Sequence, residues 1–202
     1  MPPPIELGQR AERFRDALLK SPQNQVEGAD RVDFAAMLAR ALAERAEGRG
    51  ALPDLIGLDR ASLNALAKAY FLDADLPDLD CERIEPSADQ RSLALLMRWR
   101  GAPNSTESLW FADILARRAM EPHHLWEDLG LPERPRLTAL MQRRFPRLVA
   151  LNAANMRWKK FFSRQICADA SFSLCLAPSC EECPERSLCF PPEGAAPTLP
   201  AT

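Results

Sequence analysis

Four cysteines stand close together near the end of the chain, with the spacing C-x4-C-x2-C-x5-C: Cys175, Cys180, Cys183 and Cys189. Thiolates this close along a loop converge readily on one metal centre. The first three repeat the C-x4-C-x2-C spacing of plant-type iron-sulfur ligation, and two prolines within the run restrict its backbone. We therefore predict that this cysteine run (residues 175–189) binds metal, and we favour an iron-sulfur cluster.

Other occupants of the cysteine run remain open at this point. Structural zinc is the main alternative, because four cysteines satisfy a closed tetrahedral site, although zinc ligands usually come as two pairs from distant turns. Glu181 and Glu182 would offer oxygen ligands to a hard metal. The ending C-x2-C-x5-C also resembles endonuclease III-type DNA glycosylases, but residues 52–57 contain only one of the glycines that their helix-hairpin-helix needs.

The segment before the cysteine run, residues 157–167, reads as a helix with two distinct edges. One edge is apolar and predicted to lie in the core: Trp158, Phe161, Phe162 and Ile166. The opposite edge carries a basic stripe: Arg157, Lys160 and Arg164. Cations there would balance an anionic cluster and lower thiol pKa values; the alternative is a solvated helix face. Cys167 continues the stripe as a candidate extra ligand or sulfur-handling thiol.

The chain has two histidines, His123 and His124, in a short polar segment between predicted helices. Histidine is a common metal ligand, so either is a candidate additional ligand. The alternative is a solvated or helix-terminal histidine.

Composition bounds the class of protein. The chain has 202 residues, and its 26 basic and 28 acidic side chains give no global field that would attract nucleic acid or an anionic membrane. The first residues lack the apolar core of a signal peptide, and no apolar run approaches membrane-spanning length. We expect a cytoplasmic protein with reduced thiols rather than disulfides.

Apolar periodicity predicts helices throughout and no strand, which makes the fold all-α. The expected helices cover residues 5–19, 34–45, 61–71, 87–100, 104–120, 136–145 and 146–167. Their expected N-caps include Asp33, Ser87 and Asn104. Residues 73–86 contain four aspartates and two glutamates and should form an exposed acidic connector, with Cys81 a bystander. The predicted units are an N-terminal helix and linker (1–30), a helical domain (31–167), the cysteine-rich loop (168–190) and a disordered Pro-rich tail (191–202).

The helical domain also contains an internal similarity. Residues 34–40 and 111–117 match at five of seven positions, and each segment is followed by a Gly-Leu turn and a second helix. We interpret this as a pseudo-duplicated helical pair in which each half covers the apolar face of the other. Chance similarity between helices rich in alanine and leucine is the alternative.

Taken together, the segments 124–131, 155–162 and 164–167 and the cysteine run resemble the NifQ family of nitrogen-fixation proteins. The resemblance covers roughly residues 105–190. Ser163 stands where many relatives carry an aromatic residue, which puts no ligand in doubt. The resemblance favours His124 over His123 as the additional ligand, because His124 lies within the similar segment.

The resemblance implies a molybdenum-processing protein. Such a protein would hold a molybdenum-iron-sulfur cluster built from molybdate and supply molybdenum for the iron-molybdenum cofactor of nitrogenase. The implied partners are the cofactor-assembly scaffold and the nitrogenase iron protein, with no nucleic acid or membrane. We expect a carrier rather than an enzyme. A catalytic sulfur or redox role for Cys167 stays open, as does a structural iron-sulfur or zinc protein with a nucleic-acid or redox role.

Overall fold

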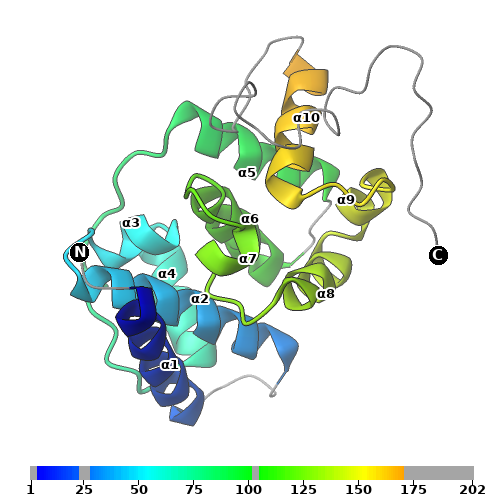
Figure 1. The fold of residues 1–202 in the computed structure, drawn as a ribbon. Coiled ribbons are helices and arrows are strands. Elements are labelled where there is room, and N and C mark those ends of the chain that lie inside the picture. The colour runs from blue at the N-terminus through cyan, green and yellow to red at the C-terminus, as the bar shows by residue number, and fades with distance from the viewer. Residues whose placement is uncertain (1–3, 23–27, 102–104, 171–202) are drawn as a thin grey trace.

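The computed structural model describes residues 4–22, 28–101 and 105–170, and the side chains of residues 6–22, 28–101 and 105–166. All regular secondary structure within these ranges is helical, as predicted. The helices are α1 (Pro4–Lys20), α2 (Ala29–Ala46), α3 (Leu52–Ile56), α4 (Arg60–Tyr70), α5 (Ala88–Arg100), α6 (Thr106–Arg118), α7 (Leu125–Asp128), α8 (Arg134–Arg144), α9 (Pro146–Leu151) and α10 (Trp158–Ala170) (Figure 1). The cysteine run lies outside the described residues.

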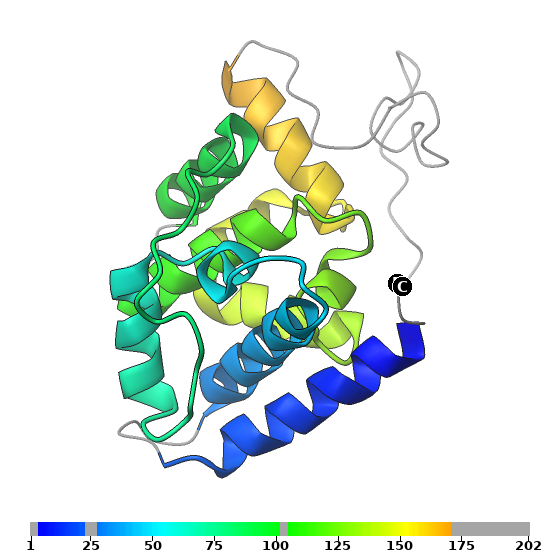
Figure 2. The same cartoon turned by 90° about the vertical axis from the view of Figure 1, so that its left-hand side faces the viewer.

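The core forms around α2 and α6, most of whose apolar residues are buried, with Val32 and Leu109 as exposed exceptions. α1 lies along α2 at one end of the molecule, and α5 and α10 pack together at the opposite end (Figures 1 and 2). α10 packs chiefly against α5, and its apolar residues belong to the same core.

The two similar segments meet at the centre of this core. The equivalent aromatic residues Phe34 of α2 and Phe111 of α6 stack with ring centroids 4.0 Å apart and planes 8° from parallel. Gly57, in the turn after α3, packs against α6, and Gly130, in the turn after α7, packs against α2. Both glycines have positive φ, 83° and 70°. This reciprocal packing is the arrangement that a duplicated helix-turn-helix unit predicts.

The predicted N-caps met different outcomes. The Ser87 hydroxyl accepts from the backbone N–H of Gln90 at 3.2 Å, which confirms that cap. The cap of α6 is Ser105 instead of Asn104. The prediction for Asp33 was wrong, because α2 begins at Ala29 and Asp33 is buried within it. Its carboxylate forms ion pairs with two arginines of α8, Arg136 at 2.5 Å and Arg143 at 2.6 Å. Asp33 therefore joins α2 to α8.

The single long helix predicted over residues 146–167 was also wrong, because the chain breaks it into α9 and α10. Asn152 replaces the helical hydrogen bonds: its Oδ1 accepts from Met156 N, and its Nδ2 donates to Met156 O, both at 2.9 Å. Asn155 adopts the left-handed region with φ 49°, which asparagine tolerates better than most residues. Because of this break, α10 runs in a different direction from α9 and packs against α5 (Figure 1).

The acidic connector is less solvated than predicted. Asp78 adopts a left-handed backbone conformation with φ 59°. Its carboxylate accepts two hydrogen bonds from the Arg45 guanidinium, at 2.5 and 2.7 Å, and its Oδ2 also accepts from the backbone N–H of Leu52 at 2.9 Å. These hydrogen bonds, chiefly from Arg45, lower the pKa of the Asp78 carboxyl from 3.8 to about 2. The connector is therefore fixed to the end of α2 and the start of α3.

Replacing Asp78 by Asn should remove this charge while keeping a residue suited to the left-handed backbone. Because Arg45 is 39% exposed, solvent screening limits the expected loss in free energy of unfolding to about 1 kcal/mol at neutral pH. The folded-state pKa is depressed, so the stabilisation is complete above pH 3.8 and disappears as the pH falls through about 2. Urea unfolding of the wild type and Asp78→Asn at a series of pH values across this window measures this loss of stabilisation. A difference in free energy of unfolding that does not change with pH would contradict the low pKa of Asp78.

Candidate metal centre

The structure describes only part of the predicted site. Cys175, Cys180, Cys183 and Cys189 lie beyond its last described residue, and Cys167 lies in α10 with its side chain outside the description. The described part of the site is therefore α10, which leads into the cysteine run, and the neighbouring histidine segment.

α10 presents the two edges that its sequence predicts. Its apolar edge is buried, which confirms that part of the prediction: Trp158, Phe161, Phe162 and Ile166. On the other edge Arg164 is exposed and Lys160 is half-buried, and Arg157, which immediately precedes α10, is exposed. The guanidinium of Arg164 contacts the sulfur of Met156 at 4.0 Å. The basic stripe thus lies on the accessible side of α10.

Sequence reasoning missed Lys159, which turns away from the basic stripe toward α7. Its ammonium donates to a carboxylate oxygen of Asp128 at 2.6 Å and to the backbone carbonyl of Glu121. The sequence carried one signal, because Phe162, three residues further on and predicted to lie in the core, shares its helical face. Lys159 therefore joins α10 to the histidine segment.

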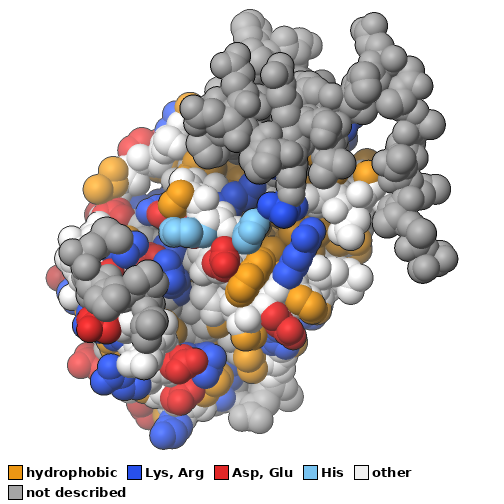
Figure 3. All heavy atoms as spheres, viewed as in Figure 1, with side chains coloured by type: hydrophobic (Ala, Val, Ile, Leu, Met, Phe, Trp, Pro, Cys, Tyr) orange, Lys and Arg blue, Asp and Glu red, His pale blue; other side chains and the backbone are white. Residues whose placement is uncertain are grey.

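The two histidines are both exposed but differ in their contacts. His123 Nδ1 lies 3.2 Å from Asp128 Oδ1, and the Asp128 side chain is only 1% exposed. His124 is the N-cap of α7, and its backbone N–H donates to Glu127 Oε2 at 2.9 Å. Both imidazoles lie on one face of the molecule, close to acidic and basic side chains (Figure 3). The structure thus gathers His123, Asp128 and Lys159 into one cluster.

A buried ion pair between Arg118 and Glu44 lies next to this cluster and contacts the backbone of Asp128. Arg118 Nε donates to the backbone carbonyl of Asp128 at 2.6 Å. The other guanidinium nitrogens of Arg118 contact the Glu44 carboxylate at 2.7 and 2.8 Å. Burial alone would raise the pKa of Glu44, but hydrogen bonds and charge from Arg118 and Arg40 outweigh it and lower that pKa. Asp128 is therefore held through both its backbone and its side chain.

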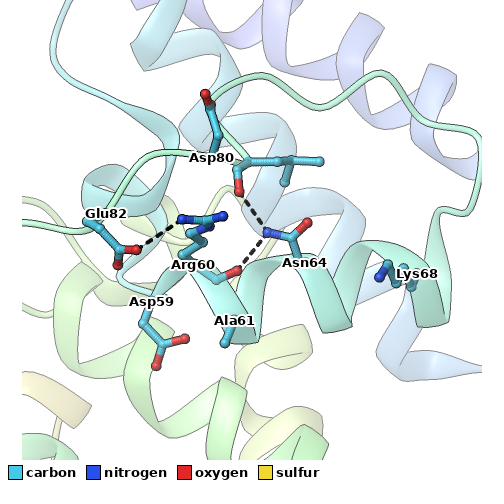
Figure 4. Close-up of a pocket in the computed structure, with 8 residues that line it drawn as sticks. Asp59, Arg60, Ala61, Asn64, Lys68, Asp80 and Glu82 are labelled. Atoms are coloured by element: carbon cyan, nitrogen blue, oxygen red, sulfur yellow. Dashed lines mark hydrogen bonds and ion pairs between the residues drawn. The ribbon is translucent and has the colours of Figure 1, made fainter.

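An open depression beside α4 is a separate feature, lined by α4 and the acidic connector (Figure 4). Asn64 Nδ2 donates to the carbonyls of Arg60 and Leu79, both at 2.8 Å, and Arg60 pairs with Glu82 at 3.4 Å. These contacts hold the connector against α4. Near it, burial and the carboxylates of its neighbours raise the pKa of the Cys81 thiol, which disfavours the thiolate that binds metals.

Two further observations apply to the described ranges. No three His, Cys, Asp or Glu side chains in them gather closely enough to hold a metal ion by themselves. No helix in them combines the length and apolar character that crossing a bilayer requires.

Comparison with known proteins gives consistent matches to one family. Residues 34–191 match the family described as NifQ. The chain is 52% identical to Protein NifQ of Rhodobacter capsulatus over 157 residues, covering 78% of this chain and 87% of that protein. It is 37% identical to a NifQ homolog of Sinorhizobium fredii (80% and 71% covered) and 34% identical to Protein NifQ of Azotobacter vinelandii (76% and 86% covered). No solved structure matches significantly. The chain belongs to the NifQ family, whose members take part in nitrogen fixation.

Proposed function

We propose that this protein is a carrier that holds molybdenum in an iron-sulfur cluster and supplies it for assembly of the iron-molybdenum cofactor of nitrogenase. The observation that carries the proposal is the cysteine run, four thiols within residues 175–189, inside the family match over residues 34–191. The cluster is the cargo of the protein, so no turnover is required. A catalytic sulfur or redox role is the competing proposal.

The donor set suits such a cargo. In a cubane of one molybdenum and three irons, each iron takes one terminal thiolate, and cysteine thiolates are the usual ligands of iron-sulfur clusters. Three of the four cysteines in the run therefore suffice for the irons. Molybdenum, which accepts nitrogen and oxygen donors as well as sulfur, would take the fourth cysteine, Cys167 or a histidine.

The proposed source of the metal is molybdate, and the proposed recipients are the cofactor-assembly scaffold and the nitrogenase iron protein. The proposed location is the cytoplasm. The histidine segment and the basic stripe both lie on accessible surface, which supports delivery by direct contact with a recipient.

The basic stripe should matter for loading through its charge. Replacing Lys160 and Arg164 together by Glu reverses two charges on the accessible side of α10, so an anionic cluster and molybdate should both be repelled. We expect lower molybdenum content with an unchanged helical circular dichroism spectrum, and a partial recovery at high salt because screening weakens the repulsion. Unchanged loading would reduce the stripe to a solvated surface.

Metal and sulfide analysis of the full chain, purified without oxygen, tests the proposed cargo. We expect iron, acid-labile sulfide and molybdenum together with a paramagnetic resonance signal from the cluster. Cys183→Ser should lose most of this cargo, whereas Cys81→Ser, the matched control outside the run, should keep it. Zinc without iron, sulfide or molybdenum would overturn the proposal.

A further inference from the structure

The Asp128 carboxylate lies between a cation and an imidazole that come from different parts of the chain. Lys159 Nζ of α10 lies 2.6 Å from one carboxylate oxygen, and His123 Nδ1 lies 3.2 Å from the other. The buried carboxylate therefore uses both of its oxygens within this cluster.

The contact between Asp128 and His123 determines where the imidazole carries its proton. An ionised carboxylate accepts hydrogen bonds but cannot donate them, and one oxygen of Asp128 already accepts from the Lys159 ammonium at 2.6 Å. Nδ1 must therefore be the donor, which leaves the lone pair of a neutral imidazole on Nε2. The His123 side chain is 63% exposed, so a group approaching from outside can reach that nitrogen.

A metal-binding imidazole usually has this arrangement. Its second ring nitrogen donates to a carboxylate, which fixes the tautomer and ring orientation and raises the basicity of the ligating nitrogen. The positioning carboxylate is itself fixed here, because Arg118 holds the Asp128 backbone carbonyl at 2.6 Å. His123 therefore has the hydrogen-bond partner that a metal-binding imidazole usually has, although its own side chain is exposed.

His124 is not placed in the same way. Its backbone contacts follow from its position at the start of α7: its N–H donates to Glu127, and its carbonyl accepts from Asp128 N at 3.0 Å. The carboxylate side chain of Asp128 contacts His123 instead. These contacts favour His123, whereas the family resemblance favoured His124.

We propose that His123, oriented by Asp128 and Lys159, is an imidazole ligand to a metal of the cargo cluster through Nε2. The inference rests on the proposed function. Asp128 is a positioning residue, since it acts through His123 and does not touch the metal. Lys159 connects this ligand to α10, the helix that leads into the cysteine run.

Pulsed paramagnetic resonance on anaerobically purified full chain, with and without ¹⁵N-labelled histidine, tests this ligand. We expect histidine-nitrogen coupling to the cluster in the wild type and in His124→Ala, and its loss in His123→Ala. X-ray absorption at the iron and molybdenum edges gives the same comparison for a diamagnetic cluster. A cluster present without histidine coupling, or coupling that survives His123→Ala, would overturn the inference while leaving the proposed cargo intact.

The substitution Asp128→Asn distinguishes a role of Asp128 in positioning His123 from a purely structural role. An amide can donate to Nδ1 and so favour the tautomer whose Nε2 carries the proton, which weakens ligation. Loss of such a positioning carboxylate costs about 10–100-fold in metal affinity, so we expect faster molybdenum loss to a chelator and altered nitrogen coupling. Purely structural damage would lower thermal stability with wild-type coupling in the folded fraction. If the wild type holds no iron, sulfide or molybdenum, the proposed function fails and this inference fails with it.

Discussion

Replacing Glu44 by Gln should lower the free energy of unfolding by about 3–5 kcal/mol, because it leaves the buried Arg118 guanidinium without its counter-charge. Both side chains are almost fully buried, and they share two hydrogen bonds of 2.7 and 2.8 Å between α2 and α6. Arg40 adds a third contact to Glu44 at 2.7 Å. Urea unfolding at neutral pH measures the loss.

The exposed pair of Arg60 and Glu82 provides a matched control for this substitution. Glu82→Gln removes an exposed ion pair, so its cost should stay below about 1 kcal/mol. The folded-state pKa of Glu44 is lowered, so the difference between wild type and Glu44→Gln should shrink as the pH falls below the ordinary glutamate value. Equal costs for the two substitutions at neutral pH would contradict the buried-pair account.

Gly57→Ala should lower the free energy of unfolding by about 2–4 kcal/mol, since it combines backbone strain with overpacking. Gly57 has φ 83°, and an added Cβ would lie 2.3 Å from Cβ of Arg117 on α6. Arg117 cannot easily move away, because its guanidinium donates to Asp54 O at 2.8 Å and pairs with Glu121 at 2.7 Å. Thermal and urea unfolding measure the effect.

Alanine substitutions at Gly48 and Gly130 are the comparison variants for this experiment. Gly48 also has positive φ, 75°, but nothing lies within 4 Å of its added Cβ, so Gly48→Ala should cost only the backbone contribution of about 1 kcal/mol. Gly130 is the pseudo-symmetric partner of Gly57, and its added Cβ would lie 2.7 Å from Cβ of Arg40. Gly130→Ala should therefore resemble Gly57→Ala. If Gly57→Ala cost no more than Gly48→Ala, the close packing of the two halves would be refuted.

Much of the fold was accessible from local sequence patterns. The apolar period over residues 158–166 correctly predicted a buried helix face, because that period depends only on neighbouring residues. The similarity between residues 34–40 and 111–117 predicted that the two segments belong to halves that pack together, and in the structure their equivalent phenylalanines stack. The break between α9 and α10 was missed, because it depends on Asn152 hydrogen-bonding both backbone groups of Met156.

The site was harder to predict, because its contacts join distant residues. Lys159 and Asp128 are 31 residues apart, and a lysine next to other cations on a helix looks solvated until its carboxylate partner is located. The same holds for His123, whose contact with the buried Asp128 carboxylate becomes visible only in the structure. Metal binding by the cysteine run remains a prediction from the spacing of the cysteines and from family membership.

Molybdenum transfer under single-turnover conditions tests the carrier function most directly. The loaded full chain would be mixed anaerobically with the cofactor-assembly scaffold and the nitrogenase iron protein, and molybdenum would be measured in each protein after separation. The carrier account predicts that molybdenum lost from this chain appears in the recipient in equal amount and that delivery stops when the chain is empty. Repeated product formation with unchanged molybdenum in this chain would contradict it and establish a catalyst instead.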